Sequence, residues 1–146
     1  MNWDEYFRNI VHQVKLKSKD KYTQIGAVIV GPDNEIVSTG YNSFPRGIND
    51  DINERQERPE KYYWFEHAER NAIYNAARIG VSTRDCRMYL TCGIPCSDCT
   101  RGIINSGIRR IICERSGGAV GTKWDEHAER SMMMFNEAEV EVVYYE

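Results

Sequence analysis

Apolar residues recur along the chain at two spacings, one typical of helices and the other typical of strands. Residues 2–17 carry them at helical spacing, whereas 25–30 is a short β-branched run that predicts a buried strand. A Gly-Pro-Asp-Asn turn at 31–34 separates this run from a second predicted strand at 35–41. The pattern therefore predicts a first helix followed by a β-hairpin.

Helices and strands alternate in the second half of the chain. The spacing predicts helices at 66–79 and 96–106, a last helix marked by Trp124, Ala128, Met132 and Phe135, and strands at 88–91, 109–113 and 140–145. Strands that alternate with helices after an initial hairpin are typical of a mixed sheet covered on both faces. The expected fold class is α/β, with three layers and a five-stranded mixed sheet in a single domain, 1–146.

The longest stretch without a regular pattern is 42–62. Pro45, Gly47, Pro59 and many charged residues oppose a packed element there. An irregular segment of this length in a compact domain is usually functional or disordered. We expect a lid or rim that closes over a pocket and excludes water, because the segment ends directly before the candidate site. A Gly-rich loop is expected at 115–122.

Composition and charge exclude several classes of protein. The formal net charge of −3 gives no general attraction to nucleic acid or anionic membranes, so a nucleic-acid partner is not expected. No apolar run approaches the roughly 20 residues of a membrane span, and the acidic start of the chain is unlike a signal peptide. The five cysteines include one Cys-x-x-Cys pair, which favours a reducing, cytoplasmic compartment over a disulfide framework.

Three residues have the spacing of a zinc site. His67 opens one predicted helix, and Cys96 and Cys99 open the next, with a predicted strand between them. One imidazole and two thiolates leave the fourth tetrahedral position of Zn²⁺ open for water, which distinguishes a catalytic site from a structural one. Pro95 suits the start of the second helix, and the positive end of the helix dipole stabilises thiolates.

Glu69 lies two residues after this histidine, where it can reach the water without binding the metal. His-x-Glu followed by Pro-Cys-x-x-Cys is the signature of zinc-dependent nucleobase deaminases. In that chemistry zinc-bound hydroxide is the nucleophile, and Glu69 shuttles protons to the ring nitrogen and the leaving amine. The backbone N–H of Ala68 would bind the carbonyl oxygen of the base. A carboxyl with both tasks needs a pKa raised toward neutrality, which a dry pocket provides.

Two features leave alternatives open. A structural zinc site would need a fourth ligand, for which Cys92 is the candidate, and would give Glu69 no role. Residues 126–130 repeat 66–70 letter for letter, as Glu-His-Ala-Glu-Arg, but no Cys-x-x-Cys follows them. We therefore expect this second copy, which includes His127, to lie on the exposed side of the last helix.

These motifs resemble the cytidine deaminase superfamily and, within it, the deoxycytidylate (dCMP) deaminase family. The likeness covers most of the chain, in the segments 23–30, 40–42, 44–47, 67–73, 88–91, 95–99 and 103–108. It implies a three-layer α-β-α fold with Zn²⁺ as the cofactor and the hydrolysis of dCMP to dUMP and ammonia. It also implies a homo-oligomer, either a dimer or a hexamer, and regulation by dCTP and dTTP.

The resemblance also assigns substrate contacts. Asn42 would hydrogen-bond the sugar or base, and Ser18 and Lys19 match the polar loop where the family meets the 5′-phosphate. Taken by themselves, Ser18 and Lys19 have the character of a solvated turn.

Two departures from the family pattern concern the substrate. The family often has a glycine after Gly-Tyr-Asn, in a loop linked to regulation, where this chain has Ser43. The loop after the fourth strand, at 114–118, lacks the aromatic residue that the family tends to place there. Another nucleobase or nucleoside, such as cytosine, cytidine or guanine, is therefore an alternative substrate. A second alternative is that the protein is a non-catalytic module stabilised by zinc.

Overall fold

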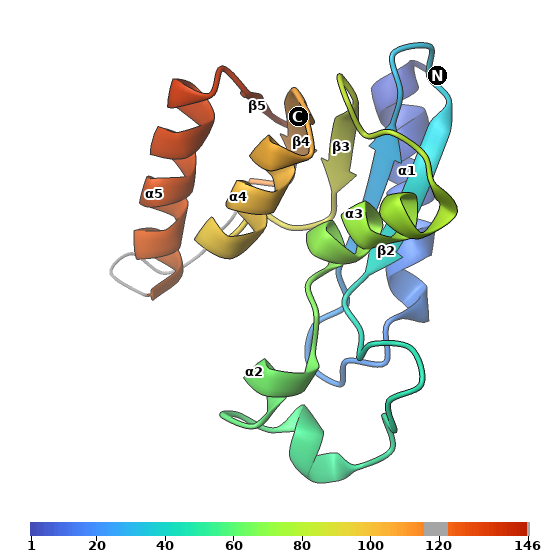
Figure 1. The fold of residues 1–146 in the computed structure, drawn as a ribbon, viewed down its shortest axis with the longest axis vertical. Coiled ribbons are helices and arrows are strands. Elements are labelled where there is room, and N and C mark those ends of the chain that lie inside the picture. Colours follow the sequence, from blue (N-terminus) through green and yellow to red (C-terminus); the bar gives the residue numbers. More distant parts are fainter. Residues whose placement is uncertain (116–122, 146) are drawn as a thin grey trace.

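The sheet at the centre of the molecule has five strands in the order β2-β1-β3-β4-β5 (Figure 1). The computed structural model describes residues 1–115 and 123–145. The strands are β1 (Gly26–Val30), β2 (Ile36–Tyr41), β3 (Arg87–Leu90), β4 (Arg110–Cys113) and β5 (Glu141–Tyr144). β1 pairs antiparallel with β2 and β3, whereas β4 pairs parallel with β3 and β5. The predicted five-stranded mixed sheet is confirmed.

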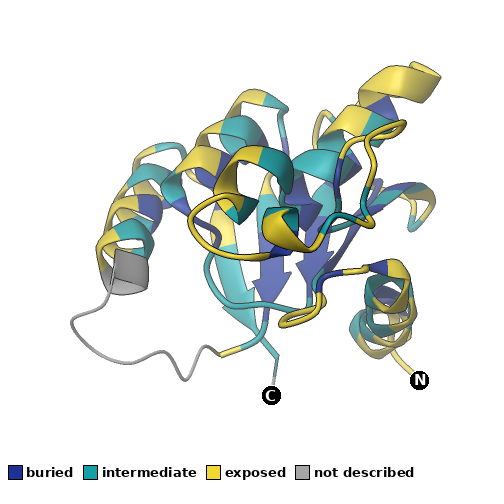
Figure 2. Cartoon of the chain, turned by 90° about the horizontal axis from the view of Figure 1, so that it is seen from below, coloured by how far each residue is buried: buried dark blue, intermediate teal, exposed yellow. Residues whose placement is uncertain are grey.

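Helices cover both faces of this sheet. α1 (Trp3–Val14) lies on one face, and α3 (Ala68–Ile79), α4 (Ser97–Asn105) and α5 (Lys123–Glu137) lie on the other (Figures 1 and 2). Alternate residues of a strand point to opposite faces, so Val28 packs with α1 while Ile29 packs with the other three helices. The predicted three-layer architecture is therefore confirmed, with one apolar core on each side of the sheet.

Two helix ends differ from the prediction. The first helix ends at Val14 and continues as the 3-10 turn η1 (Lys15–Lys17), short of the predicted single helix. Helical spacing places Ile79 on the same face as the buried Ala72 and Ala76, yet Ile79 is 63% exposed. It is the last residue of the helix, which ends at Gly80 in the left-handed conformation with φ of 78°.

The prediction that 42–62 contains no packed element is wrong. The 3-10 helix η2 (Asn53–Gln56) and the short helix α2 (Lys61–Trp64) lie in this part of the chain. Each is four residues long, too short to show a helical repeat in the sequence. The segment projects from the rest of the molecule (Figure 1), and a β-bridge between Ser43 and Glu66 holds its two ends together.

The topology brings the starts of two helices to one edge of the sheet. β2 and β3 run in the same direction, because each pairs antiparallel with β1. α3 follows β2 and α4 follows β3, so both helices begin on the side where these strands end. The carboxyl ends of strands are where open α/β sheets place their ligands.

Gly40 sets the distance between α3 and the sheet. A Cβ atom at this position would lie 2.4 Å from the Ala72 nitrogen and 2.6 Å from the Ala68 carbonyl oxygen. Both atoms belong to the backbone of α3, so no side-chain movement could relieve the overlap. The helix can therefore pack this closely on β2 only because residue 40 has no side chain.

Some expectations concern residues beyond the described ranges. Residues 116–122 of the predicted Gly-rich loop lie outside the described ranges. The side chain of Trp124 is also outside the described part of the structure. Within residues 1–115 and 123–145, no helix combines the length and apolar character needed to cross a membrane.

Candidate metal and catalytic site

His67, Cys96 and Cys99 lie together at the sheet edge where α3 and α4 begin. Their potential ligand atoms are all within 4.8 Å of one another. The Nδ1 atom of His67 is 3.3 Å from the sulfur of Cys99 and 3.5 Å from that of Cys96. His67 is the N-cap residue of α3 and Cys96 that of α4. Both caps have extended backbone, which lets the two side chains meet in front of the helix ends.

The two cysteines have pKa shifts in opposite directions. A hydrogen bond from the thiol of Cys99 lowers the pKa of Cys96 to about 4, although burial opposes this, and His67 lowers it further. The same hydrogen bond raises the pKa of Cys99, and burial adds to the effect. The hydrogen bond to Cys96 raises the pKa of His67. These opposite shifts favour the thiolate form of Cys96 and the thiol form of Cys99.

This donor set fits Zn²⁺. Two sulfur atoms and one imidazole nitrogen, from two neighbouring helix starts, match the donor set of a catalytic zinc with one position open. Cys92, the candidate fourth ligand of a structural site, is not part of the cluster among the described residues. Burial raises its pKa well above the usual value, which opposes the thiolate form that zinc requires.

Glu69 is buried beside the cluster, with 4% of its surface exposed. Burial raises the pKa of its carboxyl, against the opposing effect of His67. A raised pKa favours a carboxyl that both binds and releases a proton, as general acid–base catalysis requires. Ala68, whose N–H was predicted to bind a base carbonyl, is the first residue of α3 and is buried between these two residues.

Asn42 is held by the loop at 18–25. Its Oδ1 accepts a hydrogen bond from the N–H of Ile25 at 2.9 Å. Its Nδ2 donates to Asp20 Oδ2 at 3.1 Å and to the carbonyl of Thr23 at 2.8 Å. The amide thus has partners within the protein, and its contact with a sugar or base stays a prediction.

Ser18 and Lys19 have different surroundings. Ser18 is buried, and its hydroxyl donates to the carbonyl of Asn42 at 2.8 Å, so the alternative of a solvated turn is wrong for this residue. Lys19 is exposed, and its ammonium group forms an ion pair with Asp50 at 3.0 Å. Their predicted role near a 5′-phosphate stays a prediction.

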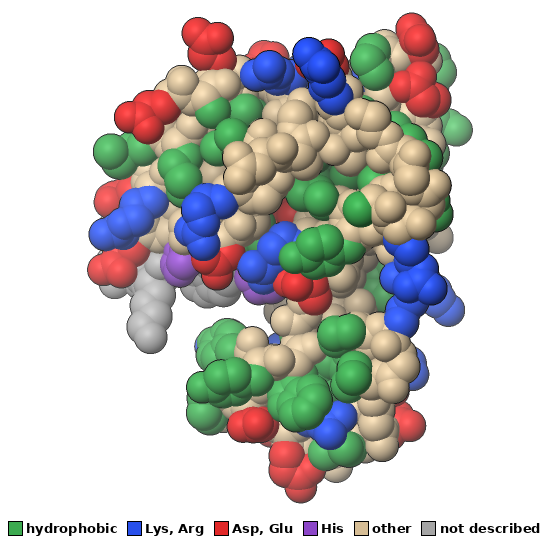
Figure 3. Space-filling view, viewed as in Figure 1, with side chains coloured by type: hydrophobic (Ala, Val, Ile, Leu, Met, Phe, Trp, Pro, Cys, Tyr) green, Lys and Arg blue, Asp and Glu red, His purple; other side chains and the backbone are tan. Residues whose placement is uncertain are grey.

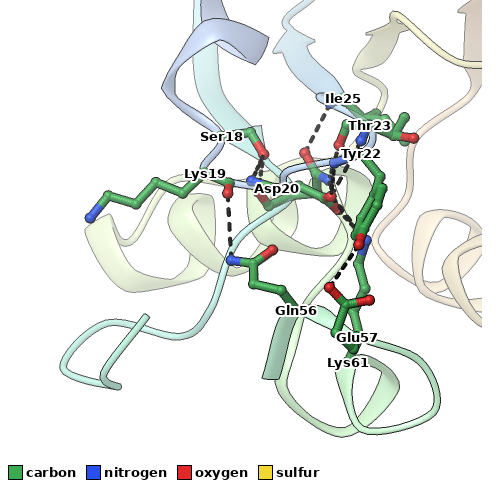
Figure 4. A network of polar contacts seen from close by, with 10 residues as sticks. Ser18, Lys19, Asp20, Tyr22, Thr23, Ile25, Gln56, Glu57 and Lys61 are labelled. Atoms are coloured by element: carbon green, nitrogen blue, oxygen red, sulfur yellow. Dashed lines mark hydrogen bonds and ion pairs between the residues drawn. The ribbon is translucent and has the colours of Figure 1, made fainter. Parts of the chain in front are cut away.

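Sequence reasoning missed Asp20, which joins this loop to the projecting segment (Figure 4). Its carboxylate pairs with the ammonium group of Lys61 at 2.8 Å and accepts hydrogen bonds from the N–H groups of Tyr22 and Thr23. The hydroxyl of Tyr22 in turn donates to Glu57 at 2.7 Å. No spacing in the sequence distinguishes this aspartate from a solvated one.

The second His-Ala-Glu does not lie wholly on the exposed side of α5. Glu129 is exposed, as predicted, but His127 is half-buried. Its Nδ1 atom accepts a hydrogen bond from the N–H of Ser97 at 3.1 Å. The prediction is therefore wrong for His127, because α5 packs against α4 and brings the imidazole to the start of that helix.

A cavity of about 260 Å³ lies between η1 and the start of the projecting segment. Figure 3 shows a separate hollow between the projecting segment and the main body, with histidine and charged side chains along its upper margin. The cavity is bordered by basic, aromatic and amide side chains, including Lys17, Lys19, Tyr41, Phe44, Arg46 and Asn71. Asn71 also connects it to the site, since its side chain donates to the carbonyls of Tyr41 and Glu66.

Comparison with known proteins identifies the family. Residues 1–115 match the family model described as the cytidine and deoxycytidylate deaminase zinc-binding region. The chain belongs to this family. It is thus a hydrolytic deaminase, and its cofactor is Zn²⁺.

Individual relatives support this assignment. An uncharacterized deaminase from the luxG 3′ region of Aliivibrio fischeri is 37% identical over 142 residues, which is 97% of this chain and 92% of that protein. Human deoxycytidylate deaminase is 37% identical over 117 residues, covering 77% of this chain but only 64% of the human protein.

A solved structure supports the fold. The dCMP deaminase of cyanophage S-TIM5, in complex with dCMP and dUMP, has a TM-score of 0.77 at 20% identity. The likeness covers 97% of this chain and 95% of the phage protein.

Proposed function

We propose that this deaminase converts dCMP to dUMP and ammonia. The observation that carries the proposal is a buried Glu69, with a raised pKa, beside the cluster of His67, Cys96 and Cys99. Support for the substrate comes from the relatives, since the human protein that is 37% identical to this chain is a deoxycytidylate deaminase. The phage structure that shares the fold contains dCMP and dUMP.

His67, Cys96 and Cys99 would hold the zinc ion. Zinc supplies Lewis acidity and lowers the pKa of water toward neutrality. The three residues would hold the ion at the N-termini of two helices, where the positive ends of the helix dipoles favour thiolates over thiols. They leave one coordination position free for the reacting water.

Glu69 would move the protons of the reaction. The oxygen of water forms a bond to the amino-bearing ring carbon, and Glu69 accepts the proton that the water loses. It would deliver this proton to the ring nitrogen, then take the second proton from the new hydroxyl group and deliver it to the amine. The carbon–nitrogen bond breaks, ammonia leaves, and the hydroxyl-bearing carbon becomes a carbonyl. The raised pKa of Glu69 suits this exchange, because the group must bind and release a proton within one cycle.

The remaining contacts would orient the nucleotide. The N–H of Ala68 would donate to the carbonyl oxygen of the base, and Asn42 would contact the sugar or base. The loop with Ser18 and Lys19 would lie near the 5′-phosphate, for which the ammonium group of Lys19 is suited by charge. Lys19 would then exchange its ion pair with Asp50 for the phosphate.

Glu69→Gln is the test of the mechanism, because it removes the ionisable carboxyl with little change in shape. We expect ammonia release from dCMP to fall by about 10²–10⁴-fold while bound zinc is retained. Glu129→Gln is the matched control, since it changes the exposed glutamate of the identical pentapeptide. Near-normal turnover by Glu69→Gln protein would contradict the assignment.

The substrate is tested by ammonia release from zinc-loaded protein with dCMP, CMP, dCTP, deoxycytidine, cytosine and guanine. Preference for dCMP is expected. Efficient turnover of a different base or nucleoside would refute the proposed substrate and preserve the proton chemistry. No turnover of any compound by zinc-loaded protein would refute the catalytic role.

Assembly, regulation and location complete the proposal. We propose a homo-oligomer, either a dimer or a hexamer, that is regulated by dCTP and dTTP and is located in the cytoplasm. Sedimentation of the zinc-loaded protein and dCMP turnover with and without each nucleotide test the first two. A monomer, or rates unaffected by either nucleotide, would contradict them.

A further inference from the structure

The same five residues, Glu-His-Ala-Glu-Arg, occupy two different positions relative to a helix. In the first copy, His67 is the N-cap residue of α3, with extended backbone. In the second copy, His127 lies inside α5, which begins at Lys123. Residues two apart within a helix point to different sides, so the imidazole of His127 faces α4 while Glu129 faces solvent.

His127 binds the first residue of α4. Its Nδ1 atom lies 3.1 Å from the nitrogen of Ser97, which is the donor, and 2.9 Å from the hydroxyl of Ser97. The N–H groups in the first turn of a helix have no acceptor within that helix. His127 therefore supplies an acceptor from a neighbouring helix, with its Nδ1 unprotonated.

Ser131 binds the same loop one helical turn further along α5. It is fully buried, and its hydroxyl donates to the carbonyl of Pro95 at 2.7 Å. It accepts in turn from the hydroxyl of Thr100, also fully buried, at 2.9 Å. Residues four apart share a face of a helix, so His127 and Ser131 act on α4 from one side.

These contacts surround Cys96. The carbonyl of Pro95, before the cysteine, is held by Ser131, and the N–H of Ser97, after it, is held by His127. Cys96 thus lies between two peptide groups that are both fixed by α5. α5 lies beyond residue 115, where the match to the family model ends.

We propose that His127 and Ser131 are positioning residues that fix Cys96 for zinc binding. The inference rests on the proposed ligand set of His67, Cys96 and Cys99. Groups that orient metal ligands without touching the metal typically change metal affinity by about 10–100-fold when they are removed. His127 and Ser131 do so here through the backbone on either side of the ligand.

The test compares two replacements of His127. His127→Leu introduces an apolar side chain of similar bulk and removes the acceptor, whereas His127→Asn is smaller but places an oxygen near the position of Nδ1. Zinc affinity is measured by competition with a chromogenic chelator, and unfolding by urea is measured alongside. We expect His127→Leu to bind zinc about 10–100-fold more weakly and His127→Asn to restore most of the affinity.

Ser131→Ala provides a second measurement, and Glu129→Gln provides the control on the same helix. We expect Ser131→Ala to weaken zinc binding and Glu129→Gln to leave it unchanged. Wild-type affinity of His127→Leu protein would overturn the proposal, and so would equal weakness of the Leu and Asn variants. If His127→Leu protein does not fold, Ser131→Ala decides, and unaltered affinity of that variant overturns the proposal.

The ligand set is tested separately by Cys99→Ser in otherwise unchanged protein. Wild-type zinc affinity in that variant would refute the proposed ligands and with them the function. Loss of affinity in Cys99→Ser together with wild-type affinity in the His127 and Ser131 variants would refute only the positioning role.

Discussion

Asp20 shows how the environment of one residue decides its charge. Its surface is 9% exposed, and burial by itself favours the neutral acid. The hydrogen bonds from Lys61 and from the N–H groups of Tyr22 and Thr23 outweigh burial and lower the pKa of the carboxyl. The ionised side chain then holds Asn42, so a single carboxylate connects the projecting segment to a predicted substrate contact.

Asp20→Asn should lower the free energy of unfolding by about 2 kcal/mol at pH 7, because it leaves the ammonium group of Lys61 without its carboxylate. The folded-state pKa of Asp20 is below the unfolded value of about 3.9, so its contribution is complete above that pH and is lost as the pH falls through the folded value. Urea unfolding between pH 7 and pH 3 measures both effects.

The variant should therefore show a shallower loss of stability than the wild type below about pH 4. Asp51→Asn, at an exposed position, is the control and should leave both the stability and its pH dependence near wild type. Wild-type stability of the Asp20→Asn protein at pH 7 would contradict the role of this carboxylate.

At the level of elements, the packing of α3 on β2 depends on one glycine. The backbone of α3 passes so close to Gly40 that any side chain there would overlap it. α3 carries Glu69 and has His67 as its N-cap residue, so its distance from the sheet also sets the position of two proposed functional groups.

Two identical substitutions should therefore have opposite effects. Gly40→Ala should destabilise the protein by about 1–3 kcal/mol, because α3 must move away from the sheet, and it should weaken zinc binding. Gly102→Ala, inside α4, should stabilise it by about 0.5–1 kcal/mol, since alanine is the better helix former and its Cβ would meet only atoms 3.9 Å away. Urea unfolding and chelator competition measure the two variants. Equal effects of the two substitutions would contradict this account.

The order of the longer elements could be predicted because each carries its own apolar pattern. The run at 25–30 and the helix from residue 66 are examples in which the local signal agrees with the final packing. α2 and η2 could not be predicted, because four residues are too few to show the helical repeat of apolar positions. Their contacts also come from elsewhere in the chain. His127 could not be predicted either, because its partner Ser97 is 30 residues away in sequence and no spacing relates them.

At the level of the whole molecule, the proposed zinc site joins two parts of the fold. His67 comes from the helix that covers β1 and β2, and the cysteines come from the helix between β3 and β4. The three residues themselves could be predicted, because their spacing in sequence reflects chemistry that is independent of the rest of the fold. Their supporting contacts could not, since those arise only when α5 packs on α4.

Removal of zinc should destabilise the whole molecule. A ligand that binds only the folded state at 1,000 times its Kd contributes about 4 kcal/mol, so chelation should lower the free energy of unfolding by about that amount. Urea unfolding with and without a chelator measures the difference. Cys99→Ser should abolish it, whereas Cys86→Ser, at a buried cysteine outside the cluster, should retain it. A chelator effect that persists in Cys99→Ser protein would contradict the ligand assignment.

The contacts of α5 with the loop around Cys96 have a consequence for protein synthesis. A ribosome adds about 5–20 residues per second, so the 32 residues from Cys99 to Ser131 take roughly 2 to 6 seconds to make. During that interval both thiols exist while the groups that hold their loop do not. If His127 and Ser131 position Cys96 as proposed, we expect the nascent chain to bind zinc at full affinity only after residues 127–131 have been made.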